Sequence, residues 1–311
     1  MCSTAAWALG NLIKPPNDGV ISQYWENQIE NGISWLLGSI PYPSTEEEFN
    51  SFIQQQHTAA AQPTNENSLQ ETEKDFLYES SGEGAWLAAY LTAPSLENIS
   101  ILLKIPVSQL ESDKIVDVSS NFKNLVSGCV GLLTRGSVRD PLLSLPALRL
   151  LGNFICKSDA ISEYLLNTPC FLTSVRLIVM NKQLQSSALP VVREALYLIA
   201  NLSAGSHLHR IQLLNYQFLP IVFNFLVHGE FYCKKESAFT ISNLICVEGV
   251  LDILLNNFNC VPVFIALLDY RDNQMLFQAL FLIEYVLQYR PDVRFSFIFL
   301  FFAFFISISS S

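Results

Sequence analysis

The stretch VREALYLIAN (residues 192–201) combines an apolar helical pattern with one asparagine at its end. The same ending closes PALRLLGN (146–153) and KKESAFTISN (234–243), so that the three asparagines are 48 and 42 residues apart. A further 42 residues leads to QALFLIEY (278–285), where a tyrosine takes the final position. These stretches predict one helical unit that recurs about every 40 residues.

A helical unit of this period is typical of armadillo and HEAT solenoids. Two earlier stretches fit the same register: AAWALGNLI, with Trp7 and Asn11, and EGAWLAAYL, with Trp86 and Tyr90. The steps from Asn11 to Tyr90 and from Tyr90 to Asn153 exceed one period, which predicts two insertions. We therefore predict an all-α protein, a right-handed α-α superhelix of about six armadillo repeats, some of them incomplete.

The expected organisation has four segments. Residues 1–40 form an incomplete N-terminal repeat and the start of the next, 41–80 an acidic Gln/Thr-rich disordered insertion, 81–290 armadillo repeats, and 291–311 a Phe-rich apolar tail. Residues 43–79 carry a net charge of -7 out of -10 for the whole chain, so the repeats are close to neutral. Few aliphatic residues in the insertion favour disorder, and its shortage of basic residues argues against a pseudo-ligand for the groove.

Both ends of the chain depart from a complete array. The first helix is the third helix of a repeat without its two partners, which predicts a fragment or a short isoform. The run FSFIFLFFAFFISI (295–308) has 14 residues, whereas a membrane span needs about 20. We interpret this tail as the product of a truncated or mis-spliced gene model, with a weak tail anchor as the alternative.

Motifs for catalysis and for metal or nucleic-acid binding are absent from the sequence. It has no phosphate-binding loop, no GxSxG and no HExxH, so we predict neither an enzyme nor a cofactor nor a metal site. His207 and His209 are two residues apart and are expected at the surface or in a loop. Without a Lys/Arg-rich patch, nucleic acid is not an expected partner. Seven cysteines without a CxxC pair predict free, mostly core-facing thiols in a reducing compartment.

The functional prediction rests on the ladder, the name used here for the repeated pair of a large residue and an asparagine or tyrosine four residues later. This spacing places both side chains on one helix face. An asparagine amide can hold the backbone of an extended peptide, and an aromatic ring can pack against a Lys or Arg side chain. Glu194 and Glu236, three residues before Tyr197 and Phe239, would bind the cationic heads. The alternative is that the asparagines bond the neighbouring repeat and that the aromatic rings belong to the core.

These stretches resemble importin-alpha, the armadillo adaptor that reads nuclear localisation signals. KKESAFTISNLICVEG is similar to its KKEAAWAITNATSGG type of helix, and PALRLLGNFI is similar to PALRAVGNIV, with arginine where other repeats have tryptophan. EGAWLAAYLT resembles CWAISYLT, with tyrosine in place of asparagine. The order of these variants aligns the chain with roughly the fourth to the ninth of the family's ten repeats.

The resemblance implies a minor-type signal site, in which asparagines hold the peptide backbone and aromatic rings flank basic side chains. The candidate peptide-binding residues are Trp7, Asn11, Trp86, Arg149, Asn153, Glu194, Tyr197, Asn201, Glu236, Phe239 and Asn243. Trp7 and Asn11 match one rung, as we call a single pair of the ladder, near the major site. The tryptophans of the minor site are replaced by Tyr197 and Phe239, which offer a smaller surface and a weaker cation–π face.

The implied function is that of an importin-alpha-like adaptor for basic cargo peptides in nuclear import, located in cytoplasm and nucleus. The repeats that supply most of the major site are absent, as is the Arg-rich segment that recruits importin-beta. Importin-beta is therefore an expected partner only if the full protein has such a segment. The alternative is a general armadillo scaffold that no longer reads import signals, with membrane attachment through the tail as a further possibility.

Overall fold

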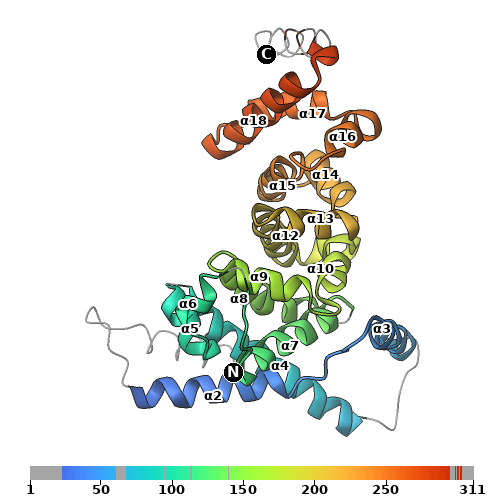
Figure 1. Ribbon diagram of the computed structural model, residues 1–311. Coiled ribbons are helices and arrows are strands. Elements are labelled where there is room, and N and C mark those ends of the chain that lie inside the picture. Colours follow the sequence, from blue (N-terminus) through green and yellow to red (C-terminus); the bar gives the residue numbers. More distant parts are fainter. Residues whose placement is uncertain are drawn as a thin grey trace. The chain divides into compact units, whose positions relative to one another are not determined.

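A computed structural model describes residues 23–60, 68–93, 95–112, 114–138 and 140–294, together with 298, 300 and 302. Within these residues every regular element is a helix and no strand is formed, which confirms the all-α prediction. The chain divides into two compact units, Met1–Asn201 and Leu202–Ser311. Figure 1 shows their helices, coloured along the sequence.

The first unit contains the helices of three repeats. They are α2 (Gln23–Gly38), α3 (Glu46–Ala60), α4 (Ser68–Thr92), α5 (Leu96–Leu103), α6 (Val107–Leu110), α7 (Ser120–Gly136), η1 (Pro141–Leu143), α8 (Ser144–Ile155), α9 (Asp159–Leu166), α10 (Phe171–Met180), α11 (Lys182–Ser187) and α12 (Leu189–Ala204), which runs to the start of the second unit. The repeats are α2 with α4, α5 to α8, and α9 to α12.

Two layers of helices build this unit. The middle helices α2, α7 and α10 pack one after another in one layer, and the third helices α4 and α8 pack together in the other. The α2–α7 packing depends on Gly128, because a Cβ atom there would lie 2.4 Å from the carbonyl oxygen of Leu37. The ladder residues all belong to third helices, so the second layer carries the candidate site.

Residues 41–80 differ from the disorder expected for them. Residues 46–60 are in α3 and 68–80 in the first half of α4, and only 61–67 lie outside the described part of this segment. Thr45 and Ser44 bind Glu48 at the start of α3, where acidic residues also suit the helix dipole. The disorder was predicted from the low average content of aliphatic residues. A helix that packs by one side needs few apolar residues, and one of them in α3, Phe49, is buried.

The step of 48 residues between Asn153 and Asn201 also has a structural cause. The extra short helix α11 has six residues, which equals the excess over the 42-residue step that follows. Asn181 caps this helix by accepting from the backbone N–H groups of Gln183 and Leu184. The insertion therefore lies between the second and the third helix of its repeat and leaves the ladder helix α12 intact.

The second unit contains two helical trios. They are α13 (His207–Asn215), α14 (Phe218–His228) and α15 (Phe231–Leu244), followed by α16 (Val250–Phe258), α17 (Cys260–Ala266) with η2 (Leu267–Asp269), α18 (Asn273–Tyr289) and η3 (Pro291–Val293). Pro220 and Pro262 lie in the first turns of α14 and α17, where no intrahelical N–H bond is lost.

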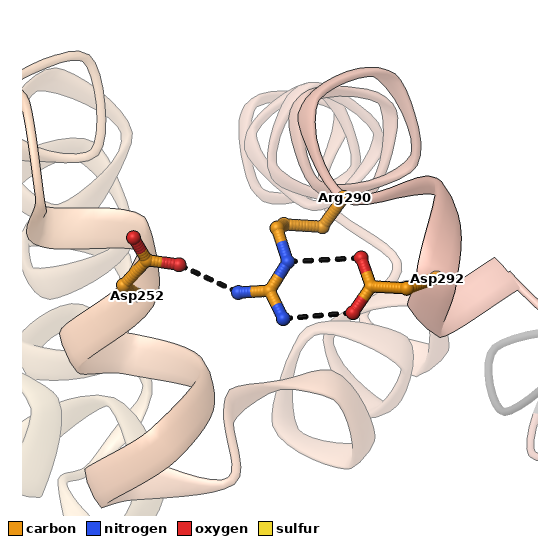
Figure 2. A network of polar contacts seen from close by, with 3 residues as sticks. All are labelled: Asp252, Arg290 and Asp292. Carbon is orange, nitrogen blue, oxygen red and sulfur yellow. Dashed lines mark hydrogen bonds and ion pairs between the residues drawn. The ribbon is translucent and has the colours of Figure 1, made fainter.

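An arginine fixes the end of α18. Arg290 donates to both carboxylate oxygens of Asp292, at 2.9 and 2.7 Å, and to Asp252 of α16 at 2.6 Å (Figure 2). These bonds raise the pKa of the guanidinium and lower that of Asp292. The planar fork of arginine suits this pairing, and Arg290 joins the end of α18 both to α16 and to the turn η3.

The expectation for the histidines is wrong at one position. His209 is buried, and its Nδ1 accepts from the backbone N–H of Ser206, whose hydroxyl in turn accepts from the N–H of His209. This reciprocal capping box begins α13. His209 therefore has a local structural role, whereas His207 is exposed as expected.

The six described cysteines are free thiols, and four of them are buried. Among the described residues, no group of His, Cys, Asp or Glu is arranged to hold a metal ion. Nor is any single helix among the described residues both long and apolar enough to cross a membrane. The helix α16 and residues 260–269 reach that length and apolar character only together, as a pair bent by 93°. Most of the Phe-rich tail lies outside the described residues.

Candidate functional site

The ladder occupies equivalent positions on the third helices. Its described pairs are Trp86–Tyr90 on α4, Arg149–Asn153 on α8, Tyr197–Asn201 on α12, Phe239–Asn243 on α15 and Phe281–Tyr285 on α18. Trp7 and Asn11 lie outside the described residues. The predicted residues thus share one register, but their side chains have different partners.

Asn153 is tied to the preceding repeat. Its Nδ2 donates to the carbonyl oxygen of Ala89 at 2.8 Å and lies 3.4 Å from the hydroxyl of Thr92, both on α4. Thr92 is buried, and its own hydroxyl donates back to Ala88. The structural alternative considered for these asparagines therefore applies to Asn153, which joins two third helices.

Asn243 makes an equivalent bond in the second unit. Its Nδ2 lies 3.0 Å from the hydroxyl oxygen of Ser203, a fully buried residue. Ser203 follows Asn201 by two positions, just as Thr92 follows Tyr90 by two. A hydroxyl two residues after the ladder position thus receives the asparagine of the next repeat in both units.

Asn201 has no such hydroxyl opposite it. The residue two positions after Asn153 is Ile155, which is apolar and buried. The Nδ2 of Asn201 donates instead to the carbonyl oxygen of Tyr197 in its own helix, at 2.9 Å. This bond is local, and its acceptor is a backbone carbonyl oxygen of the same helix. The amide of Asn201 can therefore exchange it for another partner at a small cost in free energy.

Tyr197 forms an exposed wall beside this asparagine. The side chain is 36% exposed, and its hydroxyl lies 3.3 Å from the thiol of Cys156. The ring stands over Gly152, where a Cβ atom would be 3.7 Å from it. A flat aromatic face beside a half-buried amide is suited to an extended peptide, in which the amide binds the backbone and the ring a side chain.

The acidic residue of the same rung is already paired. Arg149 donates to Glu194 at 2.5 Å, and the two side chains are 48% and 14% exposed. Burial raises the pKa of Glu194, although Arg149 acts to lower it. The expectation that Glu194 serves a peptide's cation is therefore corrected in one respect, because a cation of this chain already binds it.

The rung on α15 is surrounded differently. Phe239 and Glu236 are half-buried, and Tyr232, one turn before Glu236, is 57% exposed. Lys235 bonds Asp272, the N-cap of α18, at 3.1 Å, which joins the two third helices of this unit. Lys235 is therefore turned toward α18, and the face of α15 beside it is aromatic and acidic.

Aromatic residues extend the ladder at both ends. The rings of Trp86 and Tyr90 are stacked, with centroids 5.9 Å apart, and Tyr90 is half exposed. On α18 the rings of Phe281, Tyr285 and Tyr289 follow one another at 6.1 and 4.4 Å. The repeat spacing placed Tyr285 in register, but we did not predict the row of three rings on α18 or the hydroxyl residues that anchor two asparagines. The repeated four-residue spacing and the position two after each ladder residue would have indicated both.

No family model matches the chain. The chain is 24% identical over 244 residues to importin subunit alpha-2 of Oryza sativa subsp. japonica, covering 78% of this chain and 36% of the relative. It is 27% identical over 247 residues to importin subunit alpha-9 of Arabidopsis thaliana, covering 79% and 37%. The chain thus spans just over a third of the length of these curated relatives.

Solved structures share the fold. A designed armadillo repeat protein matches 92% of this chain over its whole length, with a TM-score of 0.54 and 14% identity. A set of armadillo repeat proteins computationally designed for modular peptide recognition matches with a TM-score of 0.52 and 14% identity, covering 92% of this chain and 99% of theirs. At such identities the likeness shows the fold alone. Together with the sequence matches, it identifies the chain as a divergent, importin-alpha-like armadillo-repeat protein.

Proposed function

We propose that this chain binds extended peptide segments along its third helices, as an importin-alpha-like adaptor for basic cargo signals in nuclear import. One observation carries the proposal. Tyr197 and Asn201 lie one turn apart, so a partly exposed ring stands beside an amide that bonds only within its own helix. An asparagine that bonds only within its own helix can exchange this bond for a peptide N–H or C=O.

A preference for basic peptides draws on the charges around the ladder. Glu236 lies one turn from Phe239, and Glu284 lies beside Tyr285 in sequence. Aromatic faces with carboxylates nearby favour Lys and Arg through cation–π contacts and charge-assisted bonds. The relatives named importin subunit alpha support the same reading. Under this proposal the protein works in cytoplasm and nucleus and without catalysis.

The Arg149–Glu194 pair favours a second candidate, an armadillo scaffold that binds peptides without reading import signals. Arg149 already lies 2.5 Å from the Oε1 atom of Glu194, so a peptide cation that binds this oxygen competes with Arg149. Such an exchange gains little, because one cation replaces another and the peptide loses water. A neutral side chain at this rung would leave the ion pair intact.

A titration with labelled peptides tests the proposal and separates the two candidates. A Lys/Arg-rich peptide and a matched peptide with Gln at every basic position are titrated into the full chain at low and high salt. An import-type site requires binding of the basic peptide that weakens with salt, and a loss of about five- to tenfold in affinity for Asn201→Ala. Equal binding of both peptides supports the scaffold. Binding that Asn201→Ala leaves unchanged would sink the ladder as the site.

A further inference from the structure

The segment that leaves α2 crosses two more repeats of the first unit. Ile40 is buried and passes so close to α7 that a Cβ atom at Gly131 would lie 2.6 Å from its Cγ2 atom and 3.1 Å from the carbonyl oxygen of Pro41. Gly131 lies in the interior of a helix, where glycine weakens the structure relative to alanine. Its place there is explained by the close passage of residues 40 and 41.

The far end of the segment is bound to α10. The thiol of Cys170, the N-cap of α10, lies 3.6 Å from the carbonyl oxygen of Pro43 and 3.5 Å from that of Thr45. Thr173 donates to the carboxylate of Glu46 at 2.9 Å. Phe49, in the first turn of α3, is only 1% exposed. Three polar contacts thus fasten the start of α3 to α10, and the side chain of Phe49 beside them is covered.

These contacts connect repeats that are not neighbours. The helices α2, α7 and α10 are the middle helices of three consecutive repeats, whereas in a solenoid each repeat contacts only the next one. Residues 39–49 therefore add a direct link between the first described repeat and the third. The link runs over the layer of middle helices, away from the third helices that carry the ladder, so it does not occupy the candidate site.

We propose that residues 39–49 are a strap that couples three repeats and sets the spacing of the ladder rungs in the first unit. With the strap closed, α2, α7 and α10 move as one body, and the distances between the rungs on α4, α8 and α12 are held. Release of the strap lets the joints between repeats flex. The effect on peptide binding rests on the proposed function; the coupling itself does not.

Cys170 is a built-in reporter of the strap. Its side chain is covered, and burial, with a smaller contribution from Glu46 and Glu48, raises the pKa of the thiol to about 12. A thiol of this kind reacts slowly with alkylating reagents, since the thiolate is the reactive species. Cys156, exposed in the same unit, serves as a fast internal reference, and the buried Cys129 as a slow one.

The test measures iodoacetamide labelling of each cysteine in the native full chain by peptide mass spectrometry. Wild type should label Cys156 rapidly and Cys170 slowly. Phe49→Ala should speed labelling of Cys170 at least about tenfold, a small part of the more than roughly hundredfold that the full loss of a buried phenylalanine implies, and leave Cys129 slow. Gly131→Ala should also speed Cys170, and its matched control Gly32→Ala, where a Cβ atom meets nothing within 4 Å, should not.

Two results would overturn the strap. One is rapid labelling of Cys170 in the wild type, at the rate of Cys156. The other is equal acceleration of Cys129 and Cys170 in Phe49→Ala, which would mean that the unit loosens as a whole. Peptide binding is measured separately on the same variants: a released strap with unchanged affinity would keep the coupling and remove its link to the ladder.

Discussion

The ladder pairs on α12 and α15 look alike in sequence but use their asparagines differently. Asn243 bonds Ser203 of the preceding third helix, whereas Asn201 bonds the carbonyl oxygen of Tyr197 in its own helix. The difference comes from one position, two residues after the preceding ladder residue, where Ser203 has a hydroxyl and Ile155 has none. A repeated motif therefore shows where a side chain lies, while its neighbour decides whether it supports the fold or remains available.

The largest expected effect on stability belongs to Asn153, the asparagine with two partners. Asn153→Ala removes the two bonds to Ala89 and Thr92 that join α8 to α4, which costs about 1–3 kcal/mol in total. Thermal melts should show a lower midpoint, and hydrogen exchange should speed up in α4 and α8. Asn167→Ala is the matched control, since Asn167 is exposed and bonds within its own helix. Equal effects of the two variants would contradict this use of Asn153.

The Arg149–Glu194 pair should respond next, with a dependence on pH. Arg149→Met leaves the mostly buried Glu194 without its cation, at a cost of about 1–2 kcal/mol near neutral pH, allowing for the half-exposed arginine. Burial already raises the pKa of Glu194, and loss of Arg149 raises it further. The folded protein then holds the proton more tightly than the unfolded chain, so stability falls as pH rises above the usual range of glutamate.

Melting temperatures between about pH 5 and pH 8 check this sign. The variant should lose stability relative to wild type toward the alkaline end of that range. The double variant Arg149→Met/Glu194→Gln is the control, because it has no carboxylate to titrate and its difference from wild type should change less with pH. A difference that grows toward acid would show that the burial of Glu194 is not what governs the pair.

A smaller effect, about 1 kcal/mol, is expected for Asn243→Ala, which removes a single side-chain bond. Ser203→Ala removes the same bond from the other side. A double-mutant cycle should therefore show coupling, with the double variant less unstable than the sum of the two single variants. Strict additivity would mean that the contact contributes nothing measurable to stability.

The smallest effect on stability should come from Asn201→Ala, within about 0.5 kcal/mol of wild type, because alanine favours the helix and the lost bond is internal to it. The same variant should have the strongest effect on peptide binding. Chemical denaturation and the peptide titration, carried out on the same preparation, compare the two. A clear loss of stability would place Asn201 with Asn153 and Asn243 as a residue of the fold.

Periodicity was sufficient to predict helices, repeats and the register of the ladder, because the spacing of apolar residues is a local property of the chain. What it could not provide were contacts between residues distant in sequence. The sequence near Glu194 does not indicate its pairing with Arg149, 45 residues away. Nor does the composition of residues 41–80 indicate that Phe49 is buried.

Two of the exposed groups also offer a way to measure the molecule as a whole. Cys156 and Cys246 each follow a ladder asparagine by three positions, one in each unit, and both are accessible. A donor and an acceptor dye attached at these thiols, after replacement of Cys2, would act as a spectroscopic ruler between the units. The distribution of transfer efficiencies with and without peptide would tell whether a ligand finds the ladder pairs of the two units already aligned or has to align them.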